Sequence, residues 1–480
     1  MHQQVKKVCV FGAGSAGWTT VLGFRALLPE TEITIICSTK HSSIGVGEST
    51  LPDLMFLLEQ AGINLSHFMA ETDSTLKHGM YFKNWNGEGT EYWHPFSLLD
   101  REGNMYSRAH HYHTMFKQDP VNFPIKDYYK RVHPSWTLAI ENNLSSTEMG
   151  HALHINAINF ANYIKEYVKD YITVIETDDY EINHSADKIE SITVNGSTVI
   201  EADLYIDCTG FNKVLISKIS DLENDGYEAN VNTALFGRVQ YSHPMVNFIP
   251  YTKGEATKHG WIWTTPIRSQ VGTGCVYHSD HTTDREAIDC FVDYWKGAIK
   301  EEDIRKIPFP STSLIRPWTG NVVAIGLSAG WIEPLEATGL STFIQAITSL
   351  TRFLQSKYYD QSIIDAYNAN TVMHTEDIKD FIDVHYLLSS RKDSKFWQWV
   401  SNRKPHPRLE AKLKVYKHFM PNLNNRQMSY AWAFNDISWI DTLTGYNFNF
   451  DPIPTPPTWL LNKRDMELYT DFNKLAKGQK

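Results

Sequence analysis

A glycine-rich segment near the N-terminus has the spacing of a dinucleotide-binding turn. Gly12-Ala13-Gly14-Ser15-Ala16-Gly17 follows an apolar run at 5–11 and opens a helical pattern. In such a turn the first glycine permits the bend, the second lets the backbone approach a pyrophosphate, and the third allows close packing of helix on strand. The free N–H groups and positive dipole end of the helix then bind phosphate. A purely structural glycine turn is the alternative.

The elements that position these glycines form a predicted βαβ unit. It consists of a strand at 5–11, a helix at 15–28 and a strand at 32–37. A ribose-binding acid normally ends the second strand of such a unit. Here Cys37-Ser38 stands at that place. This predicts either weakened binding of the adenosine ribose or partial substitution of the acid by Ser38.

Two later strands favour FAD over NAD as the dinucleotide. Predicted strands at 203–207 and 321–326 end in small residues, in Asp207-Cys208-Thr209-Gly210 and in Gly326-Leu327-Ser328-Ala329-Gly330. A sheet that returns twice to its cofactor in this way is typical of flavoproteins. The chain has one G-x-G-x-x-G, whereas an enzyme that reduces its own flavin often has a second site for NAD(P)H. We therefore expect reducing power to come from elsewhere.

Composition limits the remaining classes of function. The net charge is −10 without a long Lys/Arg block, which argues against nucleic-acid binding. No apolar run is long enough to span a bilayer, and the N-terminus resembles no secretory signal. Five scattered cysteines without a C-x-x-C pair predict buried reduced thiols and a cytoplasmic protein. Fourteen tryptophans fit either an aromatic cavity lining or a large aromatic core.

The length of 480 residues predicts two intimately packed modules. We expect an α/β cofactor-binding core at 1–360, with an inserted sheet. A mainly helical region is expected at 361–480, where regular structure breaks down around the proline-rich 452–459.

Further segments, taken together and in order, resemble the flavin-dependent halogenases, the family that includes the tryptophan halogenases. Thr265 and Ala337 depart from that family's pattern, and the resemblance covers about residues 5–400. The matching segments are Ile44–Pro52, Leu76-Lys77 with Phe82-Lys83-Asn84-Trp85, Gly260-Trp261-Ile262-Trp263-Thr264-Thr265-Pro266, Trp331–Leu340, and the helical stretch Asp380–Trp397.

The resemblance implies a Rossmann-like FAD-binding core of the glutathione-reductase type with a mainly helical substrate-covering module. It implies a two-component enzyme that uses reduced FAD, O₂ and chloride, bromide or iodide to make hypohalous acid and halogenate an electron-rich aromatic substrate. A separate flavin reductase would supply the reduced FAD. The C-terminal 80 residues match poorly, so we expect an enzyme that is not tryptophan-specific. Oligomeric state stays open, with a homo-oligomer among the options.

Two residues are the expected catalytic groups. Lys77 matches the lysine of the family that captures or orients the halogen electrophile, although a typical lysine is solvated. Glu336 matches the carboxylate that faces that lysine across the substrate site and polarises the electrophile or accepts the ring proton. From pattern alone, a carboxylate just before a helix stabilises the first turn. Glu333 is assigned a structural role.

The remaining expected contacts also follow the resemblance. Thr338 and Gly339, at a helix start, would bind the halide, the alternative being an ordinary helix end capped by Thr338. Trp261 and Trp263 share one strand face and, with Pro266, would separate substrate from flavin; a simple core pair is the alternative. Besides the glycine turn, the expected flavin contacts are Ser38, Gly47, Glu48, Ser49, Gly210, Gly326, Leu327 and Leu340.

The histidines receive no chemical role. We expect His154 and His385 to be structural histidines. His110-His111-Tyr112-His113 has no Cys or acidic neighbour and is interpreted as a polar surface turn, and no metal site is predicted.

Two other functions compete with halogenation. One is a flavin monooxygenase of the same fold, and the other is a flavoprotein without catalysis, which the departures at Cys37, Thr265 and Ala337 favour. Product mass after turnover with reduced FAD, O₂ and mixed halides distinguishes the three.

Overall fold

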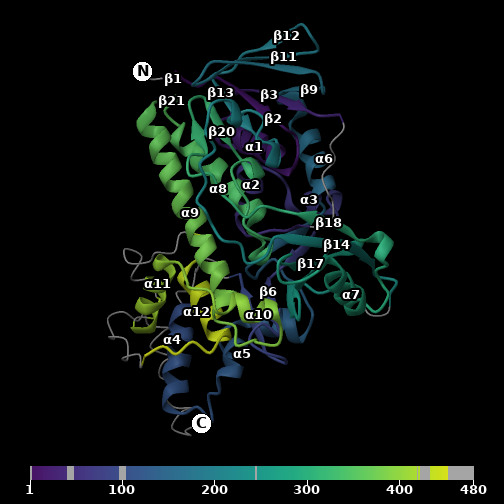
Figure 1. Cartoon of the computed structure of the whole chain (residues 1–480), viewed down its shortest axis with the longest axis vertical. Coiled ribbons are helices and arrows are strands. Elements are labelled where there is room, and N and C mark those ends of the chain that lie inside the picture. Colours follow the sequence, from purple (N-terminus) through teal and green to yellow (C-terminus); the bar gives the residue numbers. More distant parts are fainter. Residues whose placement is uncertain are drawn as a thin grey trace.

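Two large sheets and a long helix form the frame of the protein, seen in a computed structural model (Figure 1). The structure describes residues 3–39, 48–96, 104–243, 246–418, 420–421 and 433–451. Within them, no helix is long and apolar enough to cross a membrane.

The first sheet is mainly parallel and confirms the predicted βαβ opening. Its order is β19 (Trp318–Thr319), β20 (Val322–Ala324), β13 (Leu204–Asp207), β2 (Lys7–Phe11), β3 (Glu32–Cys37) and β9 (Thr173–Glu176). Only β19 and β20 pair antiparallel. Since β13 and β20 follow β2 in this order, the chain returns twice to the edge where the glycine turn leaves β2, as the sequence predicts.

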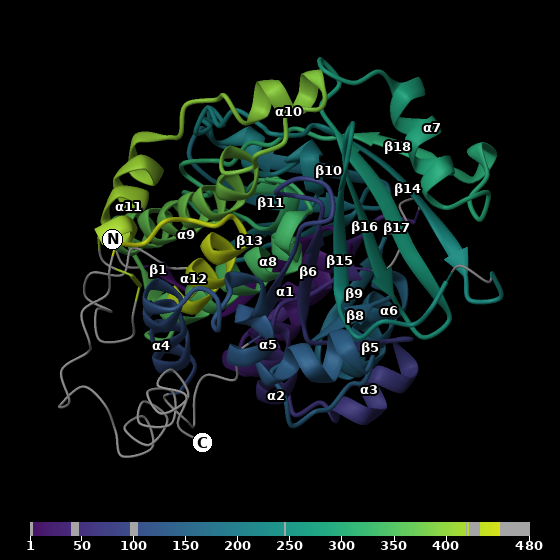
Figure 2. The ribbon, with the colours of Figure 1, turned by 90° about the horizontal axis from the view of Figure 1, so that it is seen from below.

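The second sheet has seven strands and separates two cores. Its order is β18 (Arg305–Pro308), β14 (Thr233–Gln240), β17 (Gln270–Tyr277), β16 (Gly260–Pro266), β15 (Thr252–Thr257), β6 (Gly79–Lys83) and β7 (Glu91–Pro95). Side chains alternate across it, so Ile262 packs with the core under α7 (Asp284–Tyr294) and Trp261 with the opposite core. Figure 2 shows α7 to one side of these strands.

Three small sheets complete the strands. They consist of β4 (Glu48–Ser49), β8 (Ala152–Ile155) and β5 (Thr75–Lys77); of β10 (Tyr180–His184), β11 (Ile189–Val194) and β12 (Thr198–Ile200); and of β1 (Gln3–Gln4) with β21 (Tyr358–Tyr359). The turn at Asn195-Gly196 joins β11 to β12 with φ of +51° and +68°.

Helices cover both sheets. Near the first sheet lie α1 (Ser15–Leu27), α2 (Asp53–Gln60), α3 (Leu65–Glu71), α6 (Ala157–Val168) and α8 (Thr338–Phe353). The 27-residue α9 (Gln361–Leu387) runs from there to the far end of the molecule (Figure 1). That end contains α4 (Asn104–Gln118), α5 (Tyr128–Val132), α10 (Lys395–Val400), α11 (Pro407–His418) and α12 (Asp436–Gly445). The division at residue 360 stays a prediction, and 452–459 lies outside the described residues.

The interpretation of residues 110–113 as a polar surface turn is wrong. They lie within α4, where His111 and His113 are 2% and 3% exposed. Nε2 of His113 bonds to Oγ1 of Thr444 in α12 at 2.9 Å, and burial lowers the pKa of this histidine to about 3. A neutral, hydrogen-bonded imidazole can be buried at modest cost, and the run of polar letters does not reveal this.

Candidate active site

The three glycines of the turn after β2 have three different surroundings. Gly12 has φ +105°, and a Cβ there would stand 2.4 Å from the carbonyl oxygen of Cys208. A Cβ on Gly17 would stand 1.9 Å from the oxygen of Gly12. A Cβ on Gly14 would meet nothing within 4 Å. Gly12 and Gly17 are therefore needed for packing, while Gly14 borders open space at the start of α1, which no side chain caps. A pyrophosphate fits this arrangement.

A buried carboxylate joins the two later loops at the same edge. Asp207 ends β13, and its Oδ2 accepts hydrogen bonds from the backbone N–H groups of Leu215 and Ile216 at 2.8 and 2.9 Å. Its other oxygen accepts the hydroxyl of Ser328 at 3.1 Å, in the turn η7 (Gly326–Ser328). The sequence analysis named the Asp207–Gly210 segment but missed this role. A single acid at the end of an apolar strand was the available signal.

The predicted flavin contacts after these strands lie near the glycine turn. Gly210 and Gly326 have φ of +68° and +78°, and a Cβ on Gly326 would stand 2.5 Å from Cβ of Ala16. Leu327 follows in η7. Leu340 is 4% exposed and belongs to the core shared with α1, so its side chain faces protein.

An acid lies beside the end of β3, just after the neighbouring strand β9. Cys37 is 6% exposed, and burial raises the pKa of its thiol to about 11. The hydroxyls of Ser38 and Thr39 both donate to Asp178, which follows β9. Sequence reasoning missed Asp178, because its proximity depends on the pairing of β3 with β9. All five cysteines are free, and four of them are buried.

Part of the predicted flavin strap is described. Gly47 lies outside the described residues. Glu48 and Ser49 form β4, and burial raises the pKa of Glu48 to about 7. The hydroxyl of Ser49 lies 2.7 Å from that of Thr252 in the second sheet, so the small sheet that contains β4 is joined to the second sheet.

Lys77 is wholly buried at the end of β5. Its Nζ donates to the carbonyl oxygen of Thr50 at 2.9 Å and lies 4.8 Å from the centre of the Phe96 ring. Burial lowers the pKa of Lys77 to about 7, although the charges of Glu336 and Asp53 oppose that shift. The alternative of a solvated lysine is therefore wrong. The amine changes charge near neutral pH.

Glu336 lies in the turn η8 (Leu335–Ala337), just before α8. It and Ala337 have φ of +63° and +58°, a left-handed pair of non-glycine residues, and the Glu336 side chain is 0% exposed. Nδ1 of His94 bonds to its Oε2 at 2.8 Å, and Nε2 of His385 lies 3.3 Å from its Oε1. Burial raises the pKa of Glu336, but the two histidines outweigh burial and bring it to about 2. The carboxylate thus faces histidines and does not cap α8.

The two histidines without an expected role differ. His154 is satisfied between the hydroxyls of Thr75 and Thr252, at 3.1 and 2.8 Å, as a structural histidine should be. His385 instead contacts Glu336, and its Nδ1 lies 2.5 Å from the hydroxyl of Tyr92. The sequence analysis missed His94, Tyr92 and this contact of His385. The available signal was a histidine that directly follows the two aromatic residues Tyr92 and Trp93 in a short strand.

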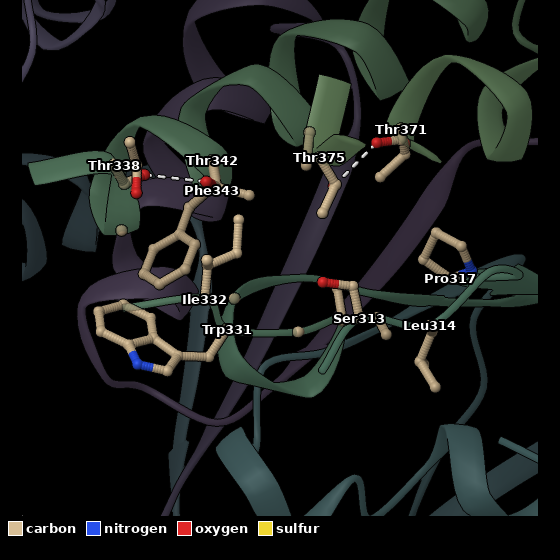
Figure 3. A pocket seen from close by; sticks show the side chains of 16 residues that line it. Ser313, Leu314, Pro317, Trp331, Ile332, Thr338, Thr342, Phe343, Thr371 and Thr375 are labelled. Carbon is tan, nitrogen blue, oxygen red and sulfur yellow. Dashed lines mark hydrogen bonds between the residues drawn. The ribbon is translucent and has the colours of Figure 1, made fainter. Parts of the chain in front are cut away.

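The predicted halide residues begin α8. The N-cap of α8 is Ala337, so the alternative of a helix end capped by Thr338 is wrong. Thr338 and Gly339 line a cavity of about 30 Å³ together with Trp331 and Phe343 (Figure 3). A Cβ on Gly339 would stand 2.7 Å from the Trp331 ring. An uncapped helix start beside a space for one small group fits an anion.

Trp261 and Trp263 share one face of β16, with ring centres 6.2 Å apart. Trp261 donates to the hydroxyl of Tyr386 at 2.9 Å, which donates to Glu333 at 2.6 Å. Burial raises the pKa of Glu333 to about 8. Through Tyr386, this buried acid holds the Trp261 ring in place. The carbonyl oxygen of Pro266 accepts the hydroxyl of Thr75 at 2.6 Å, so β16 is attached to the strand of Lys77.

A pocket of about 880 Å³ opens beside the buried charges. Its walls are largely apolar and include Leu51, Met55, Phe96 and Phe434, with His94 and Asp53 among the polar groups. Neither Lys77 nor Glu336 is among the described residues that line it. Lys77 lies behind Phe96, and Glu336 lies behind His94.

Comparisons with known proteins agree on one family. The family model described as tryptophan halogenase matches residues 7–453. The chain is 26% identical to tryptophan 7-halogenase RebH of Lentzea aerocolonigenes over 90% of this chain and 86% of that protein. It is also 26% identical to tryptophan 6-halogenase ThaL of Streptomyces albogriseolus, over 88% and 83%.

Solved structures share the fold. Tryptophan 6-halogenase SttH from Streptomyces toxytricini superposes with a TM-score of 0.83 at 23% identity, covering 98% of this chain and 96% of that one. BrvH, a flavin-dependent halogenase from Brevundimonas sp. BAL3, gives 0.80 at 23%, covering 99% and 98%.

Proposed function

The chain belongs to the tryptophan halogenase family and is a flavin-dependent halogenase, and we propose that it is a two-component enzyme for an electron-rich aromatic substrate, not restricted to tryptophan. The observation that carries the proposal is the buried Lys77 beside the carboxylate of Glu336, directly behind an apolar pocket. Such a pocket suits a flat aromatic molecule.

The residues at the carboxyl edge of the first sheet fit FAD. Gly14 and the start of α1 would hold the pyrophosphate, and Gly210 and Gly326 leave room for the rest of the cofactor. Bound reduced FAD supplies, with O₂, the two-electron oxidation of halide to hypohalous acid. Thr338 and Gly339 would hold the halide by their backbone N–H groups at the start of α8.

Lys77 would carry the halogen to the substrate. In its neutral form the amine attacks the halogen of hypohalous acid, the halogen–oxygen bond breaks, and the oxygen leaves as water after taking a proton. A positively charged N-halogenated lysine remains. Burial makes this possible near neutral pH, because it lowers the pKa of Lys77 to about 7. The Glu336 carboxylate stabilises the resulting positive charge.

Trp261, Trp263 and Pro266 would keep the substrate away from the flavin. Trp261 is fixed by Tyr386 and Glu333, which suits a rigid wall. If that wall failed, the substrate would take up oxygen instead of halogen, as in a monooxygenase. The mass of the product therefore reports on it.

Reduced FAD would come from a separate reductase. The chain has one dinucleotide turn at 12–17 and no second G-x-G-x-x-G. Anaerobic mixing of the protein, FAD and NADH should leave the visible absorbance of the flavin unbleached. Rapid bleaching would contradict the two-component assignment.

The five free thiols support the predicted cytoplasmic location.

A substrate screen tests the proposed activity. Free tryptophan, indoles, phenols and anilines are incubated with chloride, bromide and iodide, reduced FAD and O₂, and products are weighed by mass spectrometry. We expect halogen isotope patterns with aromatic compounds other than tryptophan. A gain of one oxygen would indicate a monooxygenase, and absence of product from every probe would argue for a flavoprotein without this catalysis.

A further inference from the structure

Lys77, His94, Glu336 and His385 form a buried cluster, and of these four only His94 lines the large pocket. It lies on β7, opposite Met80 of β6, and its side chain is 3% exposed. Its ring packs against Phe381 and Phe434, with centres 5.4 and 5.9 Å away. Glu336 is 0% exposed and lies behind it. A substrate in the pocket therefore meets the imidazole before the carboxylate.

The hydrogen bond to Glu336 determines which nitrogen of His94 carries the proton. Oε2 of Glu336 lies 2.8 Å from Nδ1, and the pKa of about 2 keeps this carboxylate ionised. An ionised carboxylate only accepts, so Nδ1 donates, and in the neutral form of the ring Nε2 is the nitrogen with the free lone pair. This is the arrangement in which an acid orients a histidine as a base.

Halogenation of an aromatic ring requires a base near the ring carbon that takes the halogen. When the ring takes the halogen, the carbon–halogen bond forms from a π electron pair, the nitrogen–halogen bond breaks, and Lys77 keeps its electron pair as the neutral amine. The ring is left with a positive charge and one hydrogen too many. A base must take that proton so that the C–H electron pair returns to the ring.

We infer that Nε2 of His94 accepts the proton that the aromatic ring loses, and that Glu336 is the positioning residue that orients and stabilises the resulting imidazolium. This inference rests on the proposed halogenation and names its base. Atoms and charge balance in this step. One halogen moves from nitrogen to carbon, one proton moves from carbon to His94, and the positive charge moves from Lys77 to the imidazolium. The proton then passes to water when product leaves.

The contacts of His385 support this division of roles. Its Nε2 lies 3.3 Å from Oε1 of Glu336, and its Nδ1 meets the hydroxyl of Tyr92, itself 3.2 Å from that of Tyr446. His385 is 0% exposed and is enclosed by aromatic rings. The carboxylate is thus held from behind by groups that do not line the pocket, while His94 lies between the carboxylate and the pocket.

The test uses indole and ring-deuterated indole with the full-length enzyme, reduced FAD, O₂ and bromide. In His94→Gln, halogenated product per flavin oxidised should fall about a hundredfold or more, since an amide cannot accept the proton. Loss of the ring proton should then limit the rate, so indole should react clearly faster than its deuterated form, whereas the wild type shows a ratio near one. Added imidazole should restore part of the activity of His94→Ala.

Controls separate the base from a structural role. His151→Gln changes another histidine of the same pocket, whose Nδ1 faces the carbonyl oxygen of Met149, and its isotope ratio should stay near one. If His94→Gln loses activity with a ratio near one, and imidazole does not rescue His94→Ala, His94 is not the base. If the wild type halogenates no indole with any halide, the proposed function fails first and this inference falls with it.

Discussion

The cofactor edge of the first sheet and the charge cluster behind the large pocket are built by opposite means. At the cofactor edge, backbone groups and small residues form the candidate site. Gly12, Gly14 and Gly17 lie within six residues of sequence. In the cluster, Lys77, His94, Glu336 and His385 come from β5, β7, η8 and α9 and meet only in the folded chain. The first site depends on steric room, and the second depends on buried charge.

The two sites therefore fail in different ways. A side chain added at the cofactor edge collides with backbone, which affects folding and cofactor binding together. A charge removed from the cluster leaves its partner buried and unpaired, which affects reactivity and local pKa values.

The largest expected effect is that of Lys77→Ala. Halogenated product per flavin oxidised should fall at least about a hundredfold, or roughly 3 kcal/mol of barrier, because no amine remains to carry the halogen. Lys77→Arg should fail as well, since a guanidinium keeps its charge. Mass spectrometry of product against spectroscopic measurement of flavin oxidation checks both. A variant that retains most of its product yield would remove Lys77 from the mechanism.

Gly17→Ala and Gly14→Ala sharpen the comparison on the cofactor side. A Cβ on Gly17 would stand 1.9 Å from the oxygen of Gly12, so the FAD-free variant should melt at a lower temperature than the wild type. Gly14→Ala has open space and should melt like the wild type without FAD. Both should weaken FAD binding, by about tenfold or more if roughly 1.4 kcal/mol is lost. Equal melting temperatures for the two variants would contradict the packing role of Gly17.

The pH dependence of halogen transfer reports on Lys77. Burial lowers its pKa to about 7, so the neutral fraction grows as pH rises, by about fivefold over the unit that lies below the pKa. Product per flavin oxidised should therefore rise between about pH 6 and pH 8. A flat profile across that window would contradict the neutral amine as the reacting form.

The same group affects stability in a defined direction. Between the folded pKa of about 7 and the ordinary lysine pKa of 10.5, the unfolded chain binds more protons at Lys77 than the folded chain does. This lysine should therefore make the free energy of unfolding rise with pH across that window and leave it unchanged below it. Denaturant titrations at several pH values check this. Across that window, the free energy of unfolding should rise more steeply with pH for the wild type than for Lys77→Met.

The smallest expected effect concerns Asp178. If it takes the place of the ribose-binding acid missing from the end of β3, Asp178→Asn should weaken FAD binding several-fold, because the amide keeps an acceptor oxygen and loses only about 1 kcal/mol of hydrogen-bond strength with the charge. The matched control is Asp179→Asn, an exposed neighbour. Calorimetric titration with FAD should separate the two, and equal affinities would exclude Asp178.

The sequence predicted the cofactor edge better than the cluster for a physical reason. The turn at Gly12–Gly17 follows from steric rules that act over a few residues, and so do the strand 32–37 and the start of α8 at Thr338. Asp178 was missed because its contact needs two strands to pair. His94 and His385 were missed because a polar residue gains its role from what surrounds it after folding. The buried His110–His113 segment shows the same limit.

The left-handed pair Glu336-Ala337 lies between a carboxylate behind the large pocket and the small cavity that Thr338 and Gly339 line. In the proposed function, the carboxylate would serve the substrate side, and the amides of Thr338 and Gly339 would serve the anion side. Selection for a different halide and selection for a different substrate therefore act on the same backbone angles. An engineer who shifts one of these preferences should expect the other to move with it, and should mutate the pocket walls before touching the bend.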